Sequence, residues 1–395
     1  MAVGNTTRWV ASAVADQQLS AIKQMAMLSA EVPDVASLAW GLPSFATPEH
    51  IRQAVIDALR SDRDIGKYAL PNGLPELREQ VAKVHRAKTG VEVDPTDNVL
   101  VTAGNMEGLS CLLRTIVEPG DEIIVTDPGF ASHIQQIRFS GGVPVFWPLE
   151  ESQGWRLSVE RLPALISPRT KAVILVTPAN PTGTIFARED LLRAAEIIKE
   201  RNILLFLDDP YSSFIYEKED DHCDLASHTG LSDQLVYLFT FSKCHAMSGW
   251  RMAYMVLPNW LREQVLKVHD ATMICAPRIS QIAWLAALTG DRSHVEQFRQ
   301  ILSVRRDLIF QRLDRVRHVF EYVEPQGAYY VFPKILVDHN NAFDFSLRLL
   351  NEAKVAVTPG SAFGPQGENH VRLAFCVEED QINLAFDRIE EIYPS

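Results

Sequence analysis

The sequence predicts an α/β fold: a large domain with a mostly parallel sheet covered by helices on both faces, plus a smaller α+β domain. Two observations carry this prediction. Short, continuously apolar segments alternate with segments of helical periodicity through the middle of the chain, which is typical of strands buried on both faces. The pattern then changes near residue 291, where a long amphipathic segment begins.

The strands expected in the large domain are short runs rich in β-branched and apolar residues. They span residues 98–102 (NVLVT), 122–126 (EIIVT), 143–147, 172–177 (AVILVT), 203–207 (ILLFL), 234–239 and 252–256. Helical spacing is expected over residues 106–117 and 188–201. Helices between consecutive strands are the connections that a parallel sheet requires.

The last part of the chain is expected to form the smaller domain. The helices and strands expected there span residues 293–316, 319–323, 329–332, 342–353, 355–357, 371–375 and a helix from 378. We therefore expect three parts: an N-terminal segment (1–45) that packs with the small domain, a large domain (46–290) and a small C-terminal domain (291–395).

Composition limits the classes of partner. The 395 residues carry 38 basic and 50 acidic side chains, a net charge of −12, which argues against binding to nucleic acid or an anionic membrane. No apolar run is long enough to span a bilayer, and the first residues do not read as a secretory signal. The five cysteines are scattered, without a C-x-x-C motif. We expect a cytoplasmic protein.

Polar residues follow several of the expected strands at the point where each strand ends. In an open α/β sheet, ligands bind beyond the carboxyl ends of the strands, so these side chains are expected at one rim. Taken singly, each has an ordinary explanation as a turn, a helix cap or a surface residue. Their common position indicates a site made of Gly104, Asn105, Met106, Asn180, Asp208, Tyr211, Thr240, Ser242, Lys243 and Arg251.

The order of these motifs resembles a known family. NPTG, then D-x-x-Y, then [ST]-x-[ST]-K with an arginine eight residues after the lysine, resembles the pyridoxal-phosphate-dependent class I/II aminotransferases of fold type I, the aspartate aminotransferase superfamily. Five further segments match the family in the same order: SLAWGLPSFATPEHI, KYALPNGLPELREQVA, GDEIIVTDPGF, QGAYYVF and HVRLAF. The resemblance therefore extends over nearly the whole chain.

The resemblance implies pyridoxal 5'-phosphate as the cofactor of the large domain. Lys243 is the expected catalytic residue, because an amine must hold the aldehyde as a Schiff base and can then move protons. A carboxylate, Asp208, would keep the pyridine nitrogen protonated. Asn180 and Tyr211 would bind the ring oxygen, and Phe130 would stack on the ring face.

The phosphate group of this cofactor needs backbone N–H groups at a helix N-terminus together with side-chain donors. By resemblance these come from Gly104, Asn105, Met106, Thr240, Ser242 and Arg251. Tyr68 matches a family tyrosine that reaches the phosphate from the neighbouring subunit. The resemblance thus implies a homodimer with shared active sites.

The substrate's α-carboxylate requires a planar, two-pronged partner, and Arg372 matches the family's arginine. Gly41, Trp40 and Asn180 complete the expected substrate-binding set. At the distal end of the substrate, Met106 stands where some aspartate-type members of the family carry a lysine.

An apolar and aromatic set, Trp40, Phe130, His133 and either Met273 or Ile274, is expected near that distal end. This set favours neutral, apolar or aromatic donors over aspartate. Arg278, or an arginine of the partner subunit, is the alternative source of positive charge.

The predicted function is amino-group transfer between an amino acid, neutral, apolar or aromatic, and a 2-oxo acid by a ping-pong mechanism. One alternative is a lyase of the same fold, of the C–S β-lyase or aminocyclopropane-carboxylate synthase type; another is an aspartate-type aminotransferase. A non-catalytic regulator is disfavoured, since Lys243 and Asp208 are present and the length leaves no room for a DNA-binding domain. No metal is expected, because the loose cluster of His222, Cys223, Asp224 and His228 fits no zinc spacing.

Overall fold

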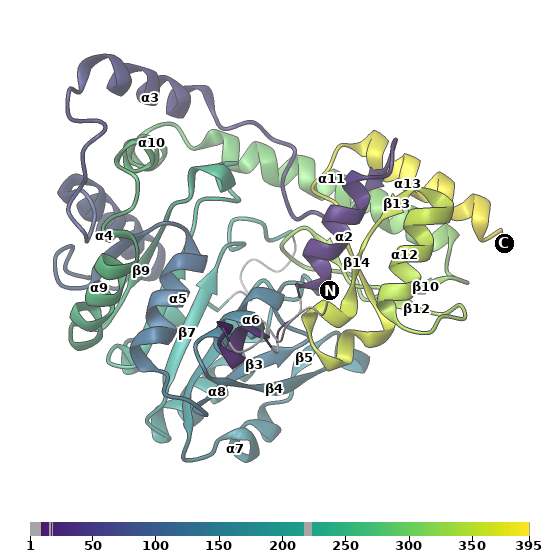
Figure 1. Ribbon diagram of the computed structural model, residues 1–395, viewed down its shortest axis with the longest axis horizontal. Helices are drawn as coiled ribbons and strands as arrows, with labels where there is room; N and C mark the ends of the chain where they lie inside the picture. The colour runs from purple at the N-terminus through teal and green to yellow at the C-terminus, as the bar shows by residue number, and fades with distance from the viewer. Residues whose placement is uncertain (1–8, 16, 18, 217–222, 395) are drawn as a thin grey trace.

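A computed structural model describes residues 9–15, 17, 19–216 and 223–394, and its centre is an eight-stranded sheet (Figure 1). Across the sheet the strands lie in the order β2-β9-β8-β7-β6-β3-β4-β5. Their bounds are β2 Val99–Thr102, β3 Glu122–Asp127, β4 Val143–Glu150, β5 Arg156–Leu157, β6 Thr170–Val176, β7 Leu204–Asp209, β8 Leu235–Phe239 and β9 Ala253–Val256.

The sheet is mostly parallel, as predicted. Strands β4, β3, β6, β7 and β8 run parallel to one another, whereas β5 runs antiparallel to β4 and β9 runs antiparallel to both β2 and β8. The reason is local: β9 follows β8 after a loop without a crossover helix, so it can only return alongside in the opposite direction. That loop carries Lys243 and Arg251.

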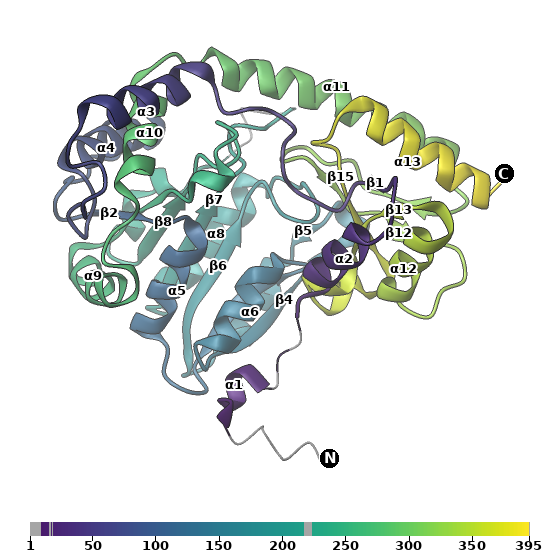
Figure 2. The ribbon, with the colours of Figure 1, turned by 45° about the horizontal axis from the view of Figure 1, so that its top comes forward.

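Helices cover both faces of the sheet (Figure 2). Alternate residues of the central strands enter two different cores: Phe206 packs in the core that includes residues of α5, α6 and α9, while Leu205 and Leu207 pack in the core on the side of α8. This two-sided burial explains the continuous apolar runs of the sequence. The helices of this part are α3 Glu49–Ser61, α4 Pro75–Thr89, α5 Asn105–Ile116, α6 Ala131–Phe139, α7 Leu162–Leu165, α8 Arg188–Glu200, α9 Asn259–Met273 and α10 Arg278–Thr289.

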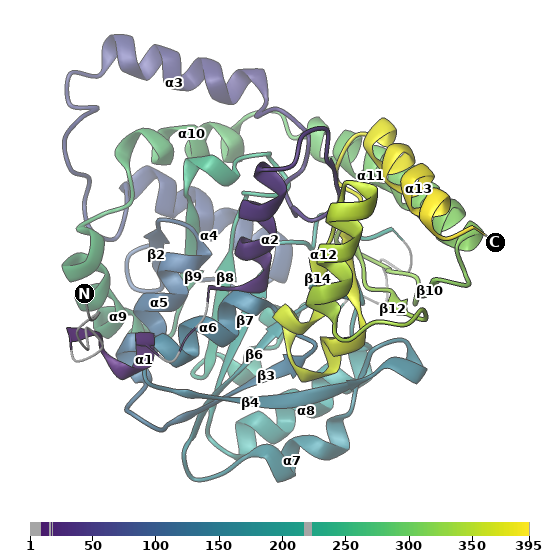
Figure 3. The same cartoon turned by 45° about the vertical axis from the view of Figure 1, so that its right-hand side comes forward.

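The C-terminal part of the sequence forms small sheets and helices that pack beside the large sheet (Figure 3). The helices are α11 Ser293–Arg315, α12 Ala342–Ala353 and α13 Glu379–Ile392. The strands are β10 Phe320–Glu321, β11 Tyr330–Val331, β12 Lys334–Ile335, β13 Val355–Ala356, β14 Thr358–Pro359 and β15 Val371–Ala374. The strand expected over residues 319–323 is shorter than predicted, because β10 has only the two-residue β12 as a partner.

Near the beginning of the described chain, helix α1 (Ser12–Ala15) contacts α6 of the large sheet's cover. Helix α2 (Ala21–Ala30) and strand β1 (Ala36–Ser37) lie instead against the small sheets, where β1 pairs in parallel with β13. Helix α2 packs against β14 and α12 (Figure 3). Among the helices within the described residues, none is both long enough and apolar enough to cross a membrane.

Candidate active site

A cavity of about 280 Å3 opens beyond the carboxyl ends of β7 and β8 and beside the N-terminus of α5. The structure brings nearly all of the predicted site residues together there; only Gly104 and Tyr68 do not line the cavity. The predicted residues that line it are Trp40, Gly41, Asn105, Met106, Phe130, Asn180, Asp208, Tyr211, Thr240, Ser242, Lys243, Arg251 and Arg372.

Gly104 lies directly behind the wall, in the tight turn between β2 and α5. Its φ of 85° lies in the left-handed region, and a Cβ at this position would overlap the guanidinium of Arg251. Arg251 itself has a φ of 55°, unusual for a residue with a side chain, and donates to the carbonyl of Ser248 over 2.9 Å. The backbone therefore holds this arginine against the start of α5.

Two hydroxyls lie on the β8–β9 loop and line the same part of the cavity. The Oγ atoms of Thr240 and Ser242 are 2.7 Å apart, and Thr240 also donates to the carbonyl of Met252. Arg251 and the N–H groups at the start of α5 form a set of donors suited to an anion, and these two hydroxyls lie beside them.

Asp208 is the second-to-last residue of strand β7, and its side chain points toward α5 and α6. Its Oδ1 accepts a 2.6 Å hydrogen bond from Nδ2 of Asn105, and its Oδ2 is 2.9 Å from Nε2 of His133. Only 7% of Asp208 is exposed. His133 was expected at the distal end of the substrate; it does line the cavity, and its contact with the carboxylate adds a role that the sequence pattern did not indicate.

The next residue on β7, Asp209, faces the other side of the sheet. It forms an ion pair with Lys88 of α4 and accepts a 2.7 Å hydrogen bond from the hydroxyl of Tyr237. Adjacent residues of a strand point to opposite faces, so only Asp208 is available to a ligand in the cavity.

Lys243 reaches the cavity from the β8–β9 loop, where its Nζ donates to the carbonyl of Gly41 over 3.1 Å. Burial lowers the pKa of Lys243 to about 8, and the cationic side chains of Arg372 and Arg251 act in the same direction. A large share of this amine is therefore neutral near pH 8, and the neutral form is the nucleophile.

Arg372 extends from β15 across the opposite wall. It donates to Oδ1 of Asn180 over 3.1 Å and to the carbonyl of Ala39 over 2.7 Å, with its guanidinium 4.4 Å from the ring centre of Tyr330. The Tyr330 hydroxyl is 3.0 Å from that of Tyr211. Sequence reasoning missed Tyr330 as a site residue, although it lies in the QGAYYVF segment.

Gly41 allows this wall to close. A Cβ at Gly41 would overlap the hydroxyl of Tyr330, so the position requires glycine. The neighbouring Trp40 is 44% exposed, and Phe130 stands edge-on to the ring of His133 at 5.1 Å. Further lining residues that the sequence did not indicate are Ser20, Ile22, Lys23, Leu109, Ser132, Pro210 and Ser248.

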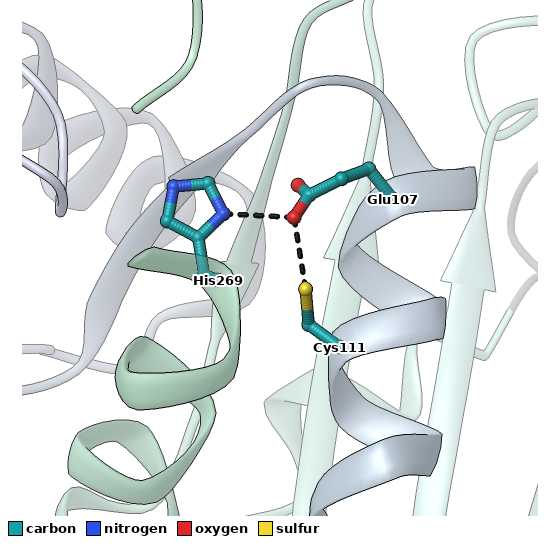
Figure 4. A group of neighbouring side chains, drawn as sticks. All are labelled: Glu107, Cys111 and His269. Carbon is teal, nitrogen blue, oxygen red and sulfur yellow. Dashed lines mark hydrogen bonds and ion pairs between the residues drawn. The ribbon is translucent and has the colours of Figure 1, made fainter. Parts of the chain in front are cut away.

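A cluster of Glu107, Cys111 and His269 braces the first turn of α5 from behind (Figure 4). Oε1 of Glu107 lies 2.8 Å from Nδ1 of His269 and 2.9 Å from the Cys111 thiol, and Oε2 accepts from the backbone N–H of Ala103. Burial alone would raise the pKa of Glu107, but the bonds from His269 and Cys111 outweigh it and lower that pKa. These hydrogen bonds account for the grouping and anchor α5 to α9.

Some residues considered from the sequence lie elsewhere. Tyr68, between α3 and α4, is 75% exposed, and Met273 and Ile274 at the end of α9 are not part of the described cavity wall. Arg278 pairs with Asp62 at 3.0 Å.

The loose cluster near residue 223 has structural contacts of its own. His222 lies outside the described residues. Asp224 accepts from the backbone N–H of Ala226 and lies 3.5 Å from Lys88, and Cys223 is buried.

Comparisons with known proteins agree with this geometry. The sequence profile described as "Aminotransferase class I and II" matches residues 33–389. An aspartate aminotransferase of Pyrococcus abyssi is 34% identical over 94% of this chain and 95% of its own, and the aromatic-amino-acid aminotransferase 2 of Thermococcus litoralis is 32% identical over the same shares. The structure of Thermus thermophilus aspartate aminotransferase with maleate superposes with a TM-score of 0.91, at 32% identity, over 97% of this chain and 99% of that one. The chain therefore belongs to the class I and II aminotransferase family and is a pyridoxal-phosphate-dependent aminotransferase of fold type I.

Proposed function

We propose that this cavity holds pyridoxal phosphate, with Lys243 as its anchoring amine and with Arg251 and Asp208 at the two ends of the ring system. The charge balance of the cavity supports the proposal. Four cationic side chains line it, and within the described residues Asp208 is the only carboxylate among the lining residues; the cations are Lys23, Lys243, Arg251 and Arg372. An anionic ligand is needed to balance them.

The individual contacts fit the parts of the cofactor. Arg251 donates to backbone carbonyls, and no ion pair with a carboxylate is found for it in the part of the chain that the structure describes. It is therefore free to receive a phosphate beside Thr240, Ser242 and the N-terminus of α5, where Asn105 and Met106 begin the helix. Asp208 would face the pyridine nitrogen and favour its protonated form.

The chemistry of the cofactor, once bound, is that its aldehyde carbon takes up an amino group while its ring withdraws electrons. The protein's part is to move a proton. Nζ of Lys243 is neutral in large part near pH 8. It would take the proton from the substrate's α-carbon and deliver it to the cofactor carbon that takes up the amino group. Asn105 and His133 would hold Asp208 in place meanwhile.

Arg372 would bind the α-carboxylate of the substrate. Its Nε is buried without a hydrogen-bond partner among the described residues, so one donor is available for a ligand. The Asn180 amide and the ring of Tyr330 fix the plane of the guanidinium. Tyr211 and Asn180 would bind the ring oxygen of the cofactor, and Phe130 would pack on its face.

We also propose that the preferred amino donors are neutral, with apolar or aromatic side chains. The walls around the substrate include Trp40, Phe130 and Met106. Burial of an apolar side chain against them contributes about 1.5–3 kcal/mol, whereas an exposed ion pair contributes about 0–1 kcal/mol. The names of the relatives, aspartate and aromatic-amino-acid aminotransferases, make both classes reasonable substrates to compare.

The test is a comparison of kcat/KM for phenylalanine, methionine, leucine and aspartate, with 2-oxo acid held constant. The proposal expects phenylalanine to exceed aspartate. A clear preference for aspartate would overturn the donor preference while leaving the assignment of Lys243 intact.

We propose further that the active unit is a homodimer in which Tyr68 enters the partner's site. Tyr68 has no role in its own cavity, and apolar side chains are exposed nearby on α3 and the segment after it: Ile56, Leu59 and Leu70. Exposed apolar surface of this kind marks contact with another chain.

A mixing experiment tests the shared site. Tyr68→Phe and Lys243→Ala variants, each of low activity alone, should regain activity when mixed, since one site of each heterodimer has both residues intact. Unchanged activity, with heterodimers demonstrated by mass spectrometry, would remove Tyr68 from the partner's site.

We propose that the chain has three parts. Residues 46–290 form the cofactor-binding domain, residues 291–395 form the small domain, and residues 1–45 pack with the small domain. The parallel pairing of β1 with β13 supports the first assignment. We propose a cytoplasmic location on the basis of the five cysteines, all of which are free and buried.

A further inference from the structure

One cation of the cavity has no task in the proposed chemistry. Lys23 lies on α2, where Ser20 caps the helix by accepting from the Lys23 backbone N–H. Its side chain is exposed, lines the cavity, and places Nζ 4.8 Å from the ring centre of Trp40. We call Lys23 and Trp40 the cavity mouth.

The other cations of the cavity are assigned. Under the proposed function, on which this inference rests, Arg251 takes the phosphate, Arg372 takes the α-carboxylate and Lys243 carries the cofactor and the proton. Arg278, the other cation considered near the distal end, is paired with Asp62 through two nitrogens at 3.0 and 3.2 Å. Lys23 is the remaining cation without an assigned role, and in the described part of the chain it has no ion pair with a carboxylate.

We infer that Lys23 is a specificity-determining residue that binds the distal carboxylate of a dicarboxylic substrate. A ping-pong aminotransferase admits its amino donor and its 2-oxo acid to one cavity in turn, so a dicarboxylic 2-oxo acid would share the mouth with the apolar side chain of the proposed donor. A lysine on a flexible four-carbon stem suits this requirement, because it can remain on Trp40 or turn toward an anion.

Two other lining residues, Met106 and Trp40, are compatible with both an apolar donor and a dicarboxylic acid. Met106 brings no charge and has a flexible side chain that adapts to different shapes. The Trp40 face that carries Nζ in the absence of an anion can pack against an apolar or aromatic side chain instead. Lys23 therefore contributes to one substrate class and not to the other.

The experiment uses the holoenzyme and two unreactive ligands of matched design, glutarate with a distal carboxylate and 3-phenylpropionate with an apolar arm. Dissociation constants are measured by spectral titration of the bound cofactor. Lys23→Met should weaken glutarate about three- to fivefold, the upper range for an exposed ion pair, while the affinity for 3-phenylpropionate stays unchanged. Lys23→Arg, which keeps the charge, should restore most of the glutarate affinity.

Lys199→Met is the matched control, because Lys199 is exposed on α8 and is not a lining residue of the cavity. The kinetic counterpart is a rise in KM for 2-oxoglutarate in Lys23→Met with little change in the half-reaction of phenylalanine. Equal losses for both ligands, or no loss for glutarate, would overturn the role of Lys23. Failure of the proposed function would look different: the unmodified enzyme would then fail to transfer the amino group of phenylalanine at all.

Discussion

The two ends of the active-site cavity are built differently. At the cofactor end, Asp208, Thr240 and Asn180 are each at most 7% exposed and are hydrogen-bonded to neighbouring groups of the protein. At the mouth, Trp40 is 44% exposed, and Nζ of the exposed Lys23 lies over its ring face. In the proposed site, the buried and hydrogen-bonded cofactor end is the frame that would hold the chemistry, while the exposed mouth would select the substrate.

The origin of each end in the sequence explains the difference. The cofactor end is formed by the ends of strands β6, β7 and β8, whose positions are fixed by the ladders of the large sheet. The mouth comes from the segment before residue 45, which is attached by two-residue β1 and by the packing of α2. A few changes in that segment can alter specificity without disturbing the frame.

The largest loss of activity is expected from a substitution at the cofactor end of the cavity. Lys243→Ala should abolish turnover and the visible absorption band of cofactor bound through this lysine, because the other lysine that lines the cavity among the described residues, Lys23, lies at the mouth. The measurement is the absorption spectrum after reconstitution and gel filtration, with kcat recorded in parallel. A variant that keeps the band at full intensity would remove Lys243 from its role.

The second prediction compares two neighbouring residues of β7, Asp208 and Asp209, whose substitution should affect activity and thermal stability differently. Asp208→Asn should lower kcat/KM about 10²–10³-fold with little change in thermal stability, because in the proposed site its carboxylate would face the cofactor. Asp209→Asn should do the reverse: it breaks the buried pair with Lys88 at a cost of about 3–5 kcal/mol, and keeps most of the catalytic power. The measurement is Tm and kcat/KM for both variants under the same conditions. If the two variants lost activity and stability to the same extent, the assignment of Asp208 and Asp209 to opposite faces of the sheet would be wrong.

A smaller effect concerns the pH dependence of cofactor capture. Burial lowers the pKa of Lys243 from its ordinary value of 10.5 to about 8, so about half of the amine is neutral and reactive at that pH, nearly all of it is neutral from about pH 9 upward, and the neutral fraction falls steeply below pH 8. The second-order rate constant for uptake of pyridoxal phosphate by cofactor-free enzyme should therefore level off above about pH 9. A rate that keeps rising to pH 10 would show that the amine of Lys243 titrates like an exposed lysine and would contradict the effect of burial.

The sequence predicted the frame better than the mouth, for physical reasons. The strand ends are marked by apolar runs, and the residues that follow them, such as Asp208 and Lys243, lie at the predicted rim. Contacts between distant segments leave no such mark: nothing local joins His133 to Asp208, or Tyr330 to Tyr211.

Helix α2 is the clearest omission. Its N-cap serine, Ser20, is a recognisable signal, but the apolar pattern that follows is short and does not show that Lys23 turns to Trp40. The pairing of Arg278 with Asp62 was equally invisible, since the two residues are far apart in the chain.

The most direct test of the central claim, amino transfer at this rim, is a half-reaction followed by absorbance. Holoenzyme mixed with phenylalanine alone should convert its cofactor once to the amino form, release one equivalent of the 2-oxo acid and stop until a 2-oxo acid is added. Continued turnover without an added 2-oxo acid, with release of ammonia, would contradict the account and indicate lyase chemistry at the same residues.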